Sequence, residues 1–379
     1  MREYARKTRN SNRDIYKGIF LWCALPLQIF FYNLFHRRRS LHTTPKILII
    51  HTCLIGEFAA SLPALATFLE KNPGAIVDIM VSPPLKPLVE KIHGIRNVFC
   101  ATSMFNRTYE HDTHTNQNFD VYTKIIILII GPEAQALLSK IKTNRIELRF
   151  LVLIRYGLHL GICLLFRRRP RPWSYTTFQL LGLTPQDSLT INFHSFFHFT
   201  QSDEARIQSL QPLQTNEIKV IIHTGGGWAK CWNNDKWIEL LKQLHHVHAL
   251  RFIFIGNSNH EEADYQYIAT RLSFPVYSLI GKTNVAESLL VLRMSNYFIG
   301  VDSGPRNLAH VVNLPSIVLM GPGPHIFTPP NPRDITIDRS GERGLYQMFF
   351  RSRHPFIEKI KPADVLAAFR ARISSVQNN

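Results

Sequence analysis

The residues best suited to chemistry lie in one turn of the second half of the chain. Asp302, Ser303 and Gly304 follow an apolar run that predicts a buried strand, and Pro305 stands where a first helical position is expected. A hydroxyl and a glycine at a helix start form a ready anion site, because free N–H groups and the helix dipole attract negative charge. The alternative is an ordinary capped helix in an α/β protein.

Two further turns after expected strands carry residues suited to phosphate. The first holds a glycine run over residues 225–227, which lets backbone N–H groups approach a ligand, and Lys230, which adds a point charge. The second is Gly281-Lys282-Thr283. Neither matches a P-loop or a dinucleotide fingerprint. Three such turns after successive strands nevertheless favour a diphosphate or nucleotide over plain turn chemistry.

The first half of the chain offers one candidate general base, Glu57, in the turn after the first expected strand. A carboxylate at a helix N-terminus is stabilised as the anion. The alternative is an ordinary N-terminal glutamate that only complements the helix dipole.

Two histidine groups resemble metal ligands at first sight, namely His111 with His114, and His245 with His246 and His248. Neither has cysteine or carboxylate support at ligand spacing, and the chain contains no D-x-D pair. We therefore expect no metal site and no cofactor.

The composition is that of a globular protein long enough for two domains: 379 residues, 45% hydrophobic and 19% charged. The net charge of +17 is concentrated in two segments. Residues 1–50 hold ten Lys/Arg and two Asp/Glu, and residues 140–171 hold nine Lys/Arg and one Glu, so each has a net charge of +8. Because the remainder is near neutral, a general nucleic-acid binder is not expected. Five cysteines without C-x-x-C spacing suggest free thiols in a reducing compartment.

Both basic segments flank apolar runs. Residues 18–35 precede three arginines at 37–39, and residues 148–166 precede three more at 167–169. The first run is barely long enough to span a bilayer, and the second contains three ionisable side chains. We expect both runs to contact an anionic membrane surface, with a core helix that has basic ends as the alternative.

Apolar strands alternating with helices predict two parallel sheets, each wrapped by helices. The expected organisation is a membrane-associating segment 1–45, a first Rossmann-like domain 46–200 with a basic apolar insert 145–172, a linker 201–217, a second Rossmann-like domain 218–355 and a C-terminal helix in 356–379. Residues 102–118 are expected to form a long polar loop.

Four motifs in order resemble glycosyltransferase family nine, the lipopolysaccharide heptosyltransferases. They are the Lys46–Leu65 opening with Ile-Gly-Glu57, the glycine-rich segment His223–Trp237 with Lys230-Cys-Trp232, the Leu-Ile-Gly-Lys-Thr segment at 279–283, and Val301–Pro322 with Asp-Ser-Gly. The resemblance covers roughly residues 46–130 and 218–330.

The resemblance implies a GT-B fold, with two facing α/β domains, an interdomain cleft, and a last helix that packs back on the first domain. It implies inverting chemistry without a metal, and a nucleotide-sugar donor such as ADP-heptose as substrate. Glu57 then becomes the catalytic base and Lys230 the catalytic diphosphate lysine. The implied nucleotide-sugar-binding residues are Thr224, Gly225, Gly226, Gly227, Lys230, Gly256, Lys282, Thr283, Asp302, Ser303, Gly304 and Asn307.

Three positions depart from the family pattern. The family usually has Asp at Glu57, Thr at Ser303 and His at Asn307. We therefore hold two hypotheses. One is a peripheral or monotopic transferase at the cytoplasmic face of the inner membrane, acting on a lipid-linked saccharide such as lipopolysaccharide core. The other is a catalytically degenerate member that binds a nucleotide or glycolipid.

Overall fold

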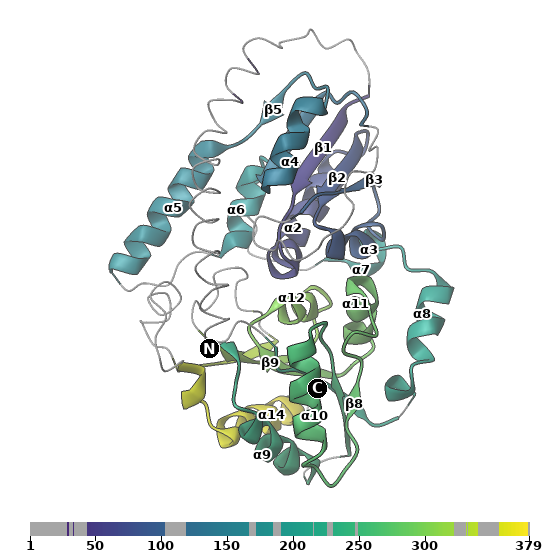
Figure 1. Ribbon diagram of the computed structural model, residues 1–379, viewed down its shortest axis with the longest axis vertical. Coiled ribbons are helices and arrows are strands. Elements are labelled where there is room, and N and C mark those ends of the chain that lie inside the picture. Colours follow the sequence, from purple (N-terminus) through teal and green to yellow (C-terminus); the bar gives the residue numbers. More distant parts are fainter. Residues whose placement is uncertain are drawn as a thin grey trace. The chain divides into compact units, whose positions relative to one another are not determined.

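The computed structural model divides the chain into two compact units. It describes residues 29, 33, 44–102, 119–166, 172–184, 191–214, 216–225, 230–246, 249–321, 331, 333–339 and 356–377. The first unit comprises Met1–Leu54, Ala64–Arg155 and Thr176–Gln186, and the second comprises Ile55–Pro63, Tyr156–Tyr175 and Asp187–Asn379. Helix α2 (Ile55–Lys71) therefore begins in the second unit and ends in the first. The helices and strands of both units are labelled in Figure 1.

The first unit is built on a parallel sheet of five strands in the order β3-β2-β1-β4-β5. The strands are β1 (Lys46–His51), β2 (Ile76–Val81), β3 (Ile95–Cys100), β4 (Lys124–Ile129) and β5 (Ile146–Glu147). Besides α2, the helices that follow these strands are α3 (Lys86–Val89) and α4 (Pro132–Leu137). Strands β1 and β4 are buried along almost their whole length, as expected for a parallel sheet covered on both faces.

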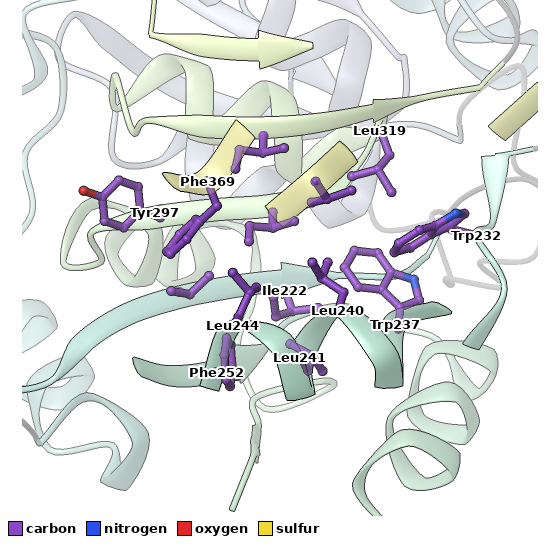
Figure 2. Packing of buried hydrophobic residues seen from close by; sticks show 14 of the residues in the cluster. Ile222, Trp232, Trp237, Leu240, Leu241, Leu244, Phe252, Tyr297, Leu319 and Phe369 are labelled. Atoms are coloured by element: carbon purple, nitrogen blue, oxygen red, sulfur yellow. The ribbon is translucent and has the colours of Figure 1, made fainter. Parts of the chain in front are cut away.

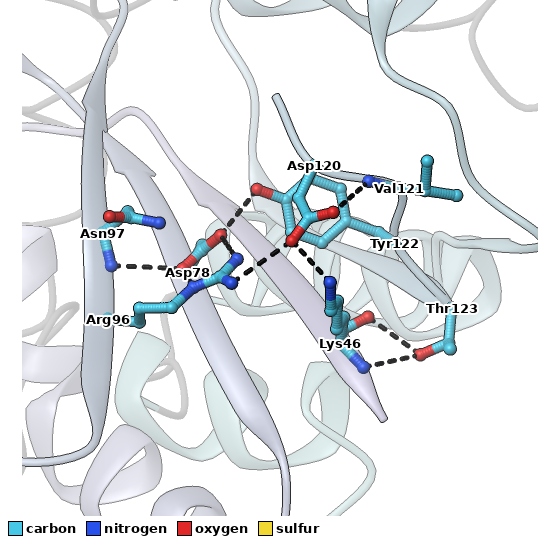
Figure 3. Close-up of polar contacts among 8 residues, drawn as sticks. All are labelled: Lys46, Asp78, Arg96, Asn97, Asp120, Val121, Tyr122 and Thr123. Atoms are coloured by element: carbon cyan, nitrogen blue, oxygen red, sulfur yellow. Dashed lines mark hydrogen bonds and ion pairs between the residues drawn. The ribbon is translucent and has the colours of Figure 1, made fainter. Parts of the chain in front are cut away.

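A buried carboxylate ties the strands of this sheet together (Figure 3). Asp78 of β2 is fully buried and accepts two hydrogen bonds from the Arg96 guanidinium, at 2.9 and 2.6 Å, and one from the Tyr122 hydroxyl at 2.7 Å. Asp120 bridges Arg96 to Lys46, at 3.2 and 2.7 Å. These bonds lower the pKa of Asp120 to about 2, with the Lys46 hydrogen bond as the largest cause. The network connects strands β1, β2 and β3 to the segment that leads into β4.

The second unit contains a parallel sheet of six strands in the order β11-β10-β9-β6-β7-β8. Its strands are β6 (Ile218–His223), β7 (Leu250–Phe254), β8 (Tyr277–Ser278), β9 (Tyr297–Val301), β10 (Ser316–Met320) and β11 (Asp334–Asp338). Its helices α9 (Asn234–His245), α10 (Asn259–Ala269), α11 (Val285–Arg293) and α12 (Gly304–Val311) alternate with the strands. Each strand from β6 to β9 therefore delivers a turn to the same edge of the sheet.

The core of the second unit lies between this sheet and the helices α9 and α14 (Pro362–Gln377), as Figure 2 shows. Trp237 of α9 is fully buried and packs edge to face on Trp232, with ring centroids 5.0 Å apart. Phe369 of α14 meets Tyr297 of β9 at 5.3 Å. The expectation for the C-terminal helix was packing on the first domain. Its apolar side chains Val365, Phe369 and Ile373 instead belong to the second core, where Tyr297 and α9 offer matching apolar surface.

The expected linker 201–217 contains helix α8 (Gln201–Gln208), and the short helix α7 (Phe193–Phe196) precedes it. Helix α8 starts with a capping box, in which Thr200 and Asp203 exchange hydrogen bonds. Arg206 of α8 pairs with Glu287 of α11 at 2.7 Å. The segment is therefore attached to the second unit. The long loop expected at 102–118 lies outside the described residues from residue 103 onward.

The two apolar runs differ in their surroundings. Of residues 18–35, the structure describes Ile29, which lies in the first unit's core, and Asn33, whose amide exchanges two 2.9 Å hydrogen bonds with the backbone of Ile146. The second run forms helix α5 (Phe150–Leu165). Helix α6 (Trp173–Leu180) follows it in the chain. Within the described ranges, no helix combines the length and apolarity needed to cross a bilayer.

Candidate functional site

The site is built around the N-terminus of α12, directly after β9. Ser303 is the N-cap residue in an extended conformation, and Pro305 follows in the first turn. The Ser303 hydroxyl donates to the Val301 carbonyl at 3.0 Å and makes no capping hydrogen bond. The first N–H groups of α12 therefore lack a side-chain cap, which suits an anion site at a helix start.

Lys230 provides a cation at this helix end. Its ammonium lies 2.8 Å from the Asp302 carboxylate and donates to the Asp302 carbonyl at 3.2 Å. Asp302 is 9% exposed, and the Lys230 side chain is 24% exposed. The ion pair holds the Lys230 ammonium beside the turn, so the structure brings together two of the three predicted phosphate turns.

The N-terminus of α2 meets the N-terminus of α12 inside the second unit. A Cβ placed on Gly304 would lie 3.2 Å from Ile55 and 3.5 Å from the Gly56 nitrogen, and the Asn307 amide donates to the Gly56 carbonyl at 3.3 Å. Two positive dipole ends thus lie together, and an anion bound beside them would gain from both. Glu57 is the acidic residue in the first turn of α2. The predicted base therefore stands one residue from the contact with α12.

Asn307 is held by a buried chain of polar groups. Arg306, only 2% exposed, donates to the Asn307 side-chain oxygen at 3.0 Å and to the Asp334 carboxylate at 2.8 Å. Burial raises the pKa of Asp334, although Arg306 opposes that shift. Because both ends of the Asn307 amide are hydrogen bonded, its orientation is fixed by Arg306 on one side and Gly56 on the other.

The glycine turn after β6 has a structural cause that the sequence analysis missed. A Cβ on Gly225 would lie 2.0 Å from a carboxylate oxygen of Glu261, and one on Gly256 would lie 2.6 Å from the same carboxylate. Glu261 accepts hydrogen bonds from the backbone of Asn257 and Ser258, both at 2.8 Å. These two glycines therefore leave room for a carboxylate at the ends of β6 and β7. The capping-box spacing of Ser258 and Glu261 was the signal that could have found it.

The third predicted turn is arranged differently. The Gly281 amide donates to the Gly256 carbonyl at 3.0 Å, so these two strand ends meet. The Thr283 hydroxyl lies 2.9 Å from the hydroxyl of Ser288, which belongs to α11. The Lys282 ammonium donates to the Ser278 carbonyl at 2.9 Å in an exposed position. No contact in the described structure brings Lys282 to Lys230 or Asp302.

Some of the remaining predicted residues lie within the described part of the chain, and others lie outside it. Thr224 is buried at the end of β6, beside His223. Burial lowers the pKa of His223, which therefore favours the neutral imidazole. Gly226 and Gly227 lie outside the described residues, as do His111, His114 and His248. Among the described residues, no group of three His, Cys, Asp or Glu side chains is arranged to hold a metal.

Arg306 and Asp334 were not foreseen either. Nothing in the sequence links residues 28 positions apart, and an arginine in the first turn of a helix normally indicates a solvated position. Taken together, the site joins Lys230, Asp302, Ser303 and Gly304 with the start of α2. Such a collection of N–H groups and one ammonium can bind a diphosphate and stabilise negative charge on it.

The second half of the chain is similar to a known protein family. Residues 183–351 match the model of Glycosyltransferase family 9 (heptosyltransferase). Lipopolysaccharide heptosyltransferase 3 of Escherichia coli is 32% identical over 142 residues, which are 37% of this chain and 42% of that protein. The aligned part thus spans less than half of that relative.

Two solved structures share the fold. The glycosyl transferase family 9 structure from Veillonella parvula superposes with a TM-score of 0.69 at 14% identity, covering 89% of this chain and all of that one. The E. coli ADP-heptose lipopolysaccharide heptosyltransferase II superposes with a TM-score of 0.62 at 17% identity, covering 88% of this chain and 99% of that one. The chain has the GT-B fold, with two parallel-sheet α/β domains.

Proposed function

We propose that this chain is a glycosyltransferase, because residues 183–351 match the model of Glycosyltransferase family 9 (heptosyltransferase) and 142 residues are 32% identical to lipopolysaccharide heptosyltransferase 3. Its donor is a nucleotide diphosphate sugar with a heptose-like ring, ADP-heptose being the first candidate. Its acceptor is a lipid-linked saccharide such as lipopolysaccharide core. The enzyme works at the cytoplasmic face of the inner membrane, and neither a metal nor a cofactor takes part.

The observation that carries the proposal is the position of Lys230, 2.8 Å from Asp302, at the uncapped start of α12. The leaving group of this reaction is a nucleoside diphosphate, on which negative charge grows as the glycosidic bond breaks. Lys230 and the N–H groups of Ser303 and Gly304 stabilise that charge. Glu57 removes the proton of the acceptor hydroxyl as its oxygen attacks the anomeric carbon. One displacement of this kind inverts the anomeric configuration.

A panel of nucleotide sugars tests the donor. We expect ADP-heptose to raise the unfolding midpoint, because a ligand at one hundred times its Kd adds about 2.7 kcal/mol to the free energy of unfolding. Transfer is then measured by mass spectrometry of a heptose-containing core acceptor, with and without EDTA. Product formation in EDTA, with an inverted anomeric centre by NMR, is expected. Binding without transfer to any core acceptor would remove the proposed activity.

One observation favours the second candidate, a degenerate protein that binds without catalysis. The Asn307 amide is engaged by Arg306 and by Gly56, so this side chain serves packing at a position where the family usually has His. Transfer of any sugar by the wild-type protein would dismiss this candidate. Restored transfer in Asn307→His alone would support it.

A further inference from the structure

Helix α5 presents an apolar face that is exposed in the part of the chain that the structure describes. In the described part of the chain, nine large hydrophobic side chains are exposed, and six of them lie on α5 or directly after it. They are Leu151, Ile154, Leu158, Ile162, Leu165 and Phe166, with exposed fractions from 40% to 76%. Such a concentration on a single helix differs from the scattered apolar residues of ordinary surfaces.

The exposed side chains form one stripe along the helix. Residues 151, 154, 158, 162 and 165 are separated by three or four positions, so they share a face about 21 Å long. The opposite side is attached to the protein: Cys163 is 2% exposed, and the Tyr156 ring meets the Trp173 ring edge to face at 5.2 Å. The helix thus has a fixed inner side and a free outer side.

We propose that this outer face of α5 binds the surface of an anionic lipid bilayer. The sequence around the stripe is basic: Arg149 precedes the helix, Arg155 lies within it, and arginines at 167–169 and 171 follow it in the sequence, so that residues 140–171 have a net charge of +8. An apolar stripe with basic neighbours fits an interface of acyl chains and anionic headgroups. The inference rests on the proposed function, since lipid contact brings the enzyme to a lipid-linked acceptor.

A helix that lies in the interface fits better than one that spans the bilayer. The 16 residues of α5 reach about 24 Å, short of the roughly 30 Å of a hydrocarbon core, and they include Arg155 and His159. The run at 18–35 is a weaker candidate, because Ile29 lies in the first core and Asn33 bonds to Ile146.

A second copy of the chain is the main rival occupant. Gly157 and Gly161 are exposed on α5 and would permit close approach of another helix. Charge opposes this arrangement, since pairing two copies through α5 brings together two segments of net charge +8.

Co-sedimentation with vesicles tests the inference. The full chain is mixed with vesicles of one part phosphatidylglycerol to one part phosphatidylcholine, and with pure phosphatidylcholine. The variant Leu158→Gln/Ile162→Gln removes apolar contact without adding charge, and Val121→Gln, at an equally exposed position of the first unit, is the matched control. We expect wild type and control to bind the anionic vesicles at least tenfold more tightly than the double variant, and more tightly than neutral vesicles.

Three results would overturn the inference: equal vesicle binding by the double variant, equal binding to neutral vesicles, or a wild-type dimer that the double variant dissociates without loss of lipid binding. Transfer to a soluble, delipidated core oligosaccharide separates this test from that of the proposed function. The double variant should retain that transfer. Vesicle binding by a wild-type protein that transfers nothing would leave the lipid site standing and remove the transferase.

Discussion

Gly225→Ala probes the packing of Glu261 against the glycine turn. The new methyl group would lie 2.0 Å from one Glu261 oxygen and 2.6 Å from Cδ and Cγ, whereas ordinary contact begins near 3.4 Å. The carboxylate must therefore move by more than 1 Å. It cannot do so freely, because its other oxygen accepts bonds of 2.7 to 2.8 Å from Asn257 and from the backbone and hydroxyl of Ser258.

The cost follows from the bonds that are lost. A cap contributes about 0.5–2 kcal/mol, and a hydrogen bond to a charged group contributes about 1.5–3 kcal/mol. We expect Gly225→Ala to lower the free energy of unfolding by about 3 kcal/mol. In the Glu261→Ala background the same substitution should cost less than about 1 kcal/mol, because the obstacle is absent.

Urea unfolding of the two single variants and the double variant measures this coupling as a double-mutant cycle. Gly74→Ala is the control, since nothing lies within 4 Å of its new methyl group. A glycine required only for ligand approach would behave differently, with weaker nucleotide binding and unchanged stability. That result, or a cost that persists without Glu261, would refute the reasoning.

Three other predictions concern the neighbouring groups. Burial lowers the pKa of His310 to about 4, so the unfolded chain binds a proton at this position before the folded chain does as the pH falls below 6.5. At pH 5 this difference lowers the free energy of unfolding by about 2 kcal/mol relative to pH 7. Urea unfolding at pH 7 and pH 5 should show a smaller loss of stability for His310→Asn than for wild type. Arg306→Met leaves the buried Asp334 without its cation and should cost about 3–5 kcal/mol, part of which Arg306→Met/Asp334→Leu recovers in the same assay; full stability of the single variant would contradict this. Lys230→Met should weaken ADP binding at least about tenfold, as measured by calorimetry. Lys282→Met should change the ADP affinity far less, because the Lys282 ammonium bonds to the Ser278 carbonyl.

The fold could be predicted because the spacing of apolar residues along the sequence reflects which side chains are buried. The apolar runs before Thr52 and before Thr224 read as buried parallel strands, and β1 and β6 are those strands. Helix caps are local interactions of the same kind, since Asn233 caps α9 and Asn284 caps α11 through contacts within the first turn. Local spacing suffices where the interaction itself is local.

The missed features depend on contacts between distant residues. The place of α14 could not be derived from its apolar spacing, which is compatible with any apolar surface and does not specify the Tyr297 ring. The ion-pair partner of Arg306 is Asp334, 28 residues later, and the reason for Gly225 is a carboxylate 36 residues later. Helix α8 in the expected linker was missed because it is short and mostly polar, so capping by Thr200 rather than periodicity marks it.

The central claim is that Glu57 acts as the base of a sugar transfer, beside the N-terminus of α12. The most direct test measures heptose transfer from ADP-heptose to a core acceptor by wild type and by Glu57→Gln, together with ADP binding by both. We expect transfer by wild type, a loss of at least about a hundredfold in Glu57→Gln, and equal ADP affinity. Undiminished transfer by Glu57→Gln would contradict the account.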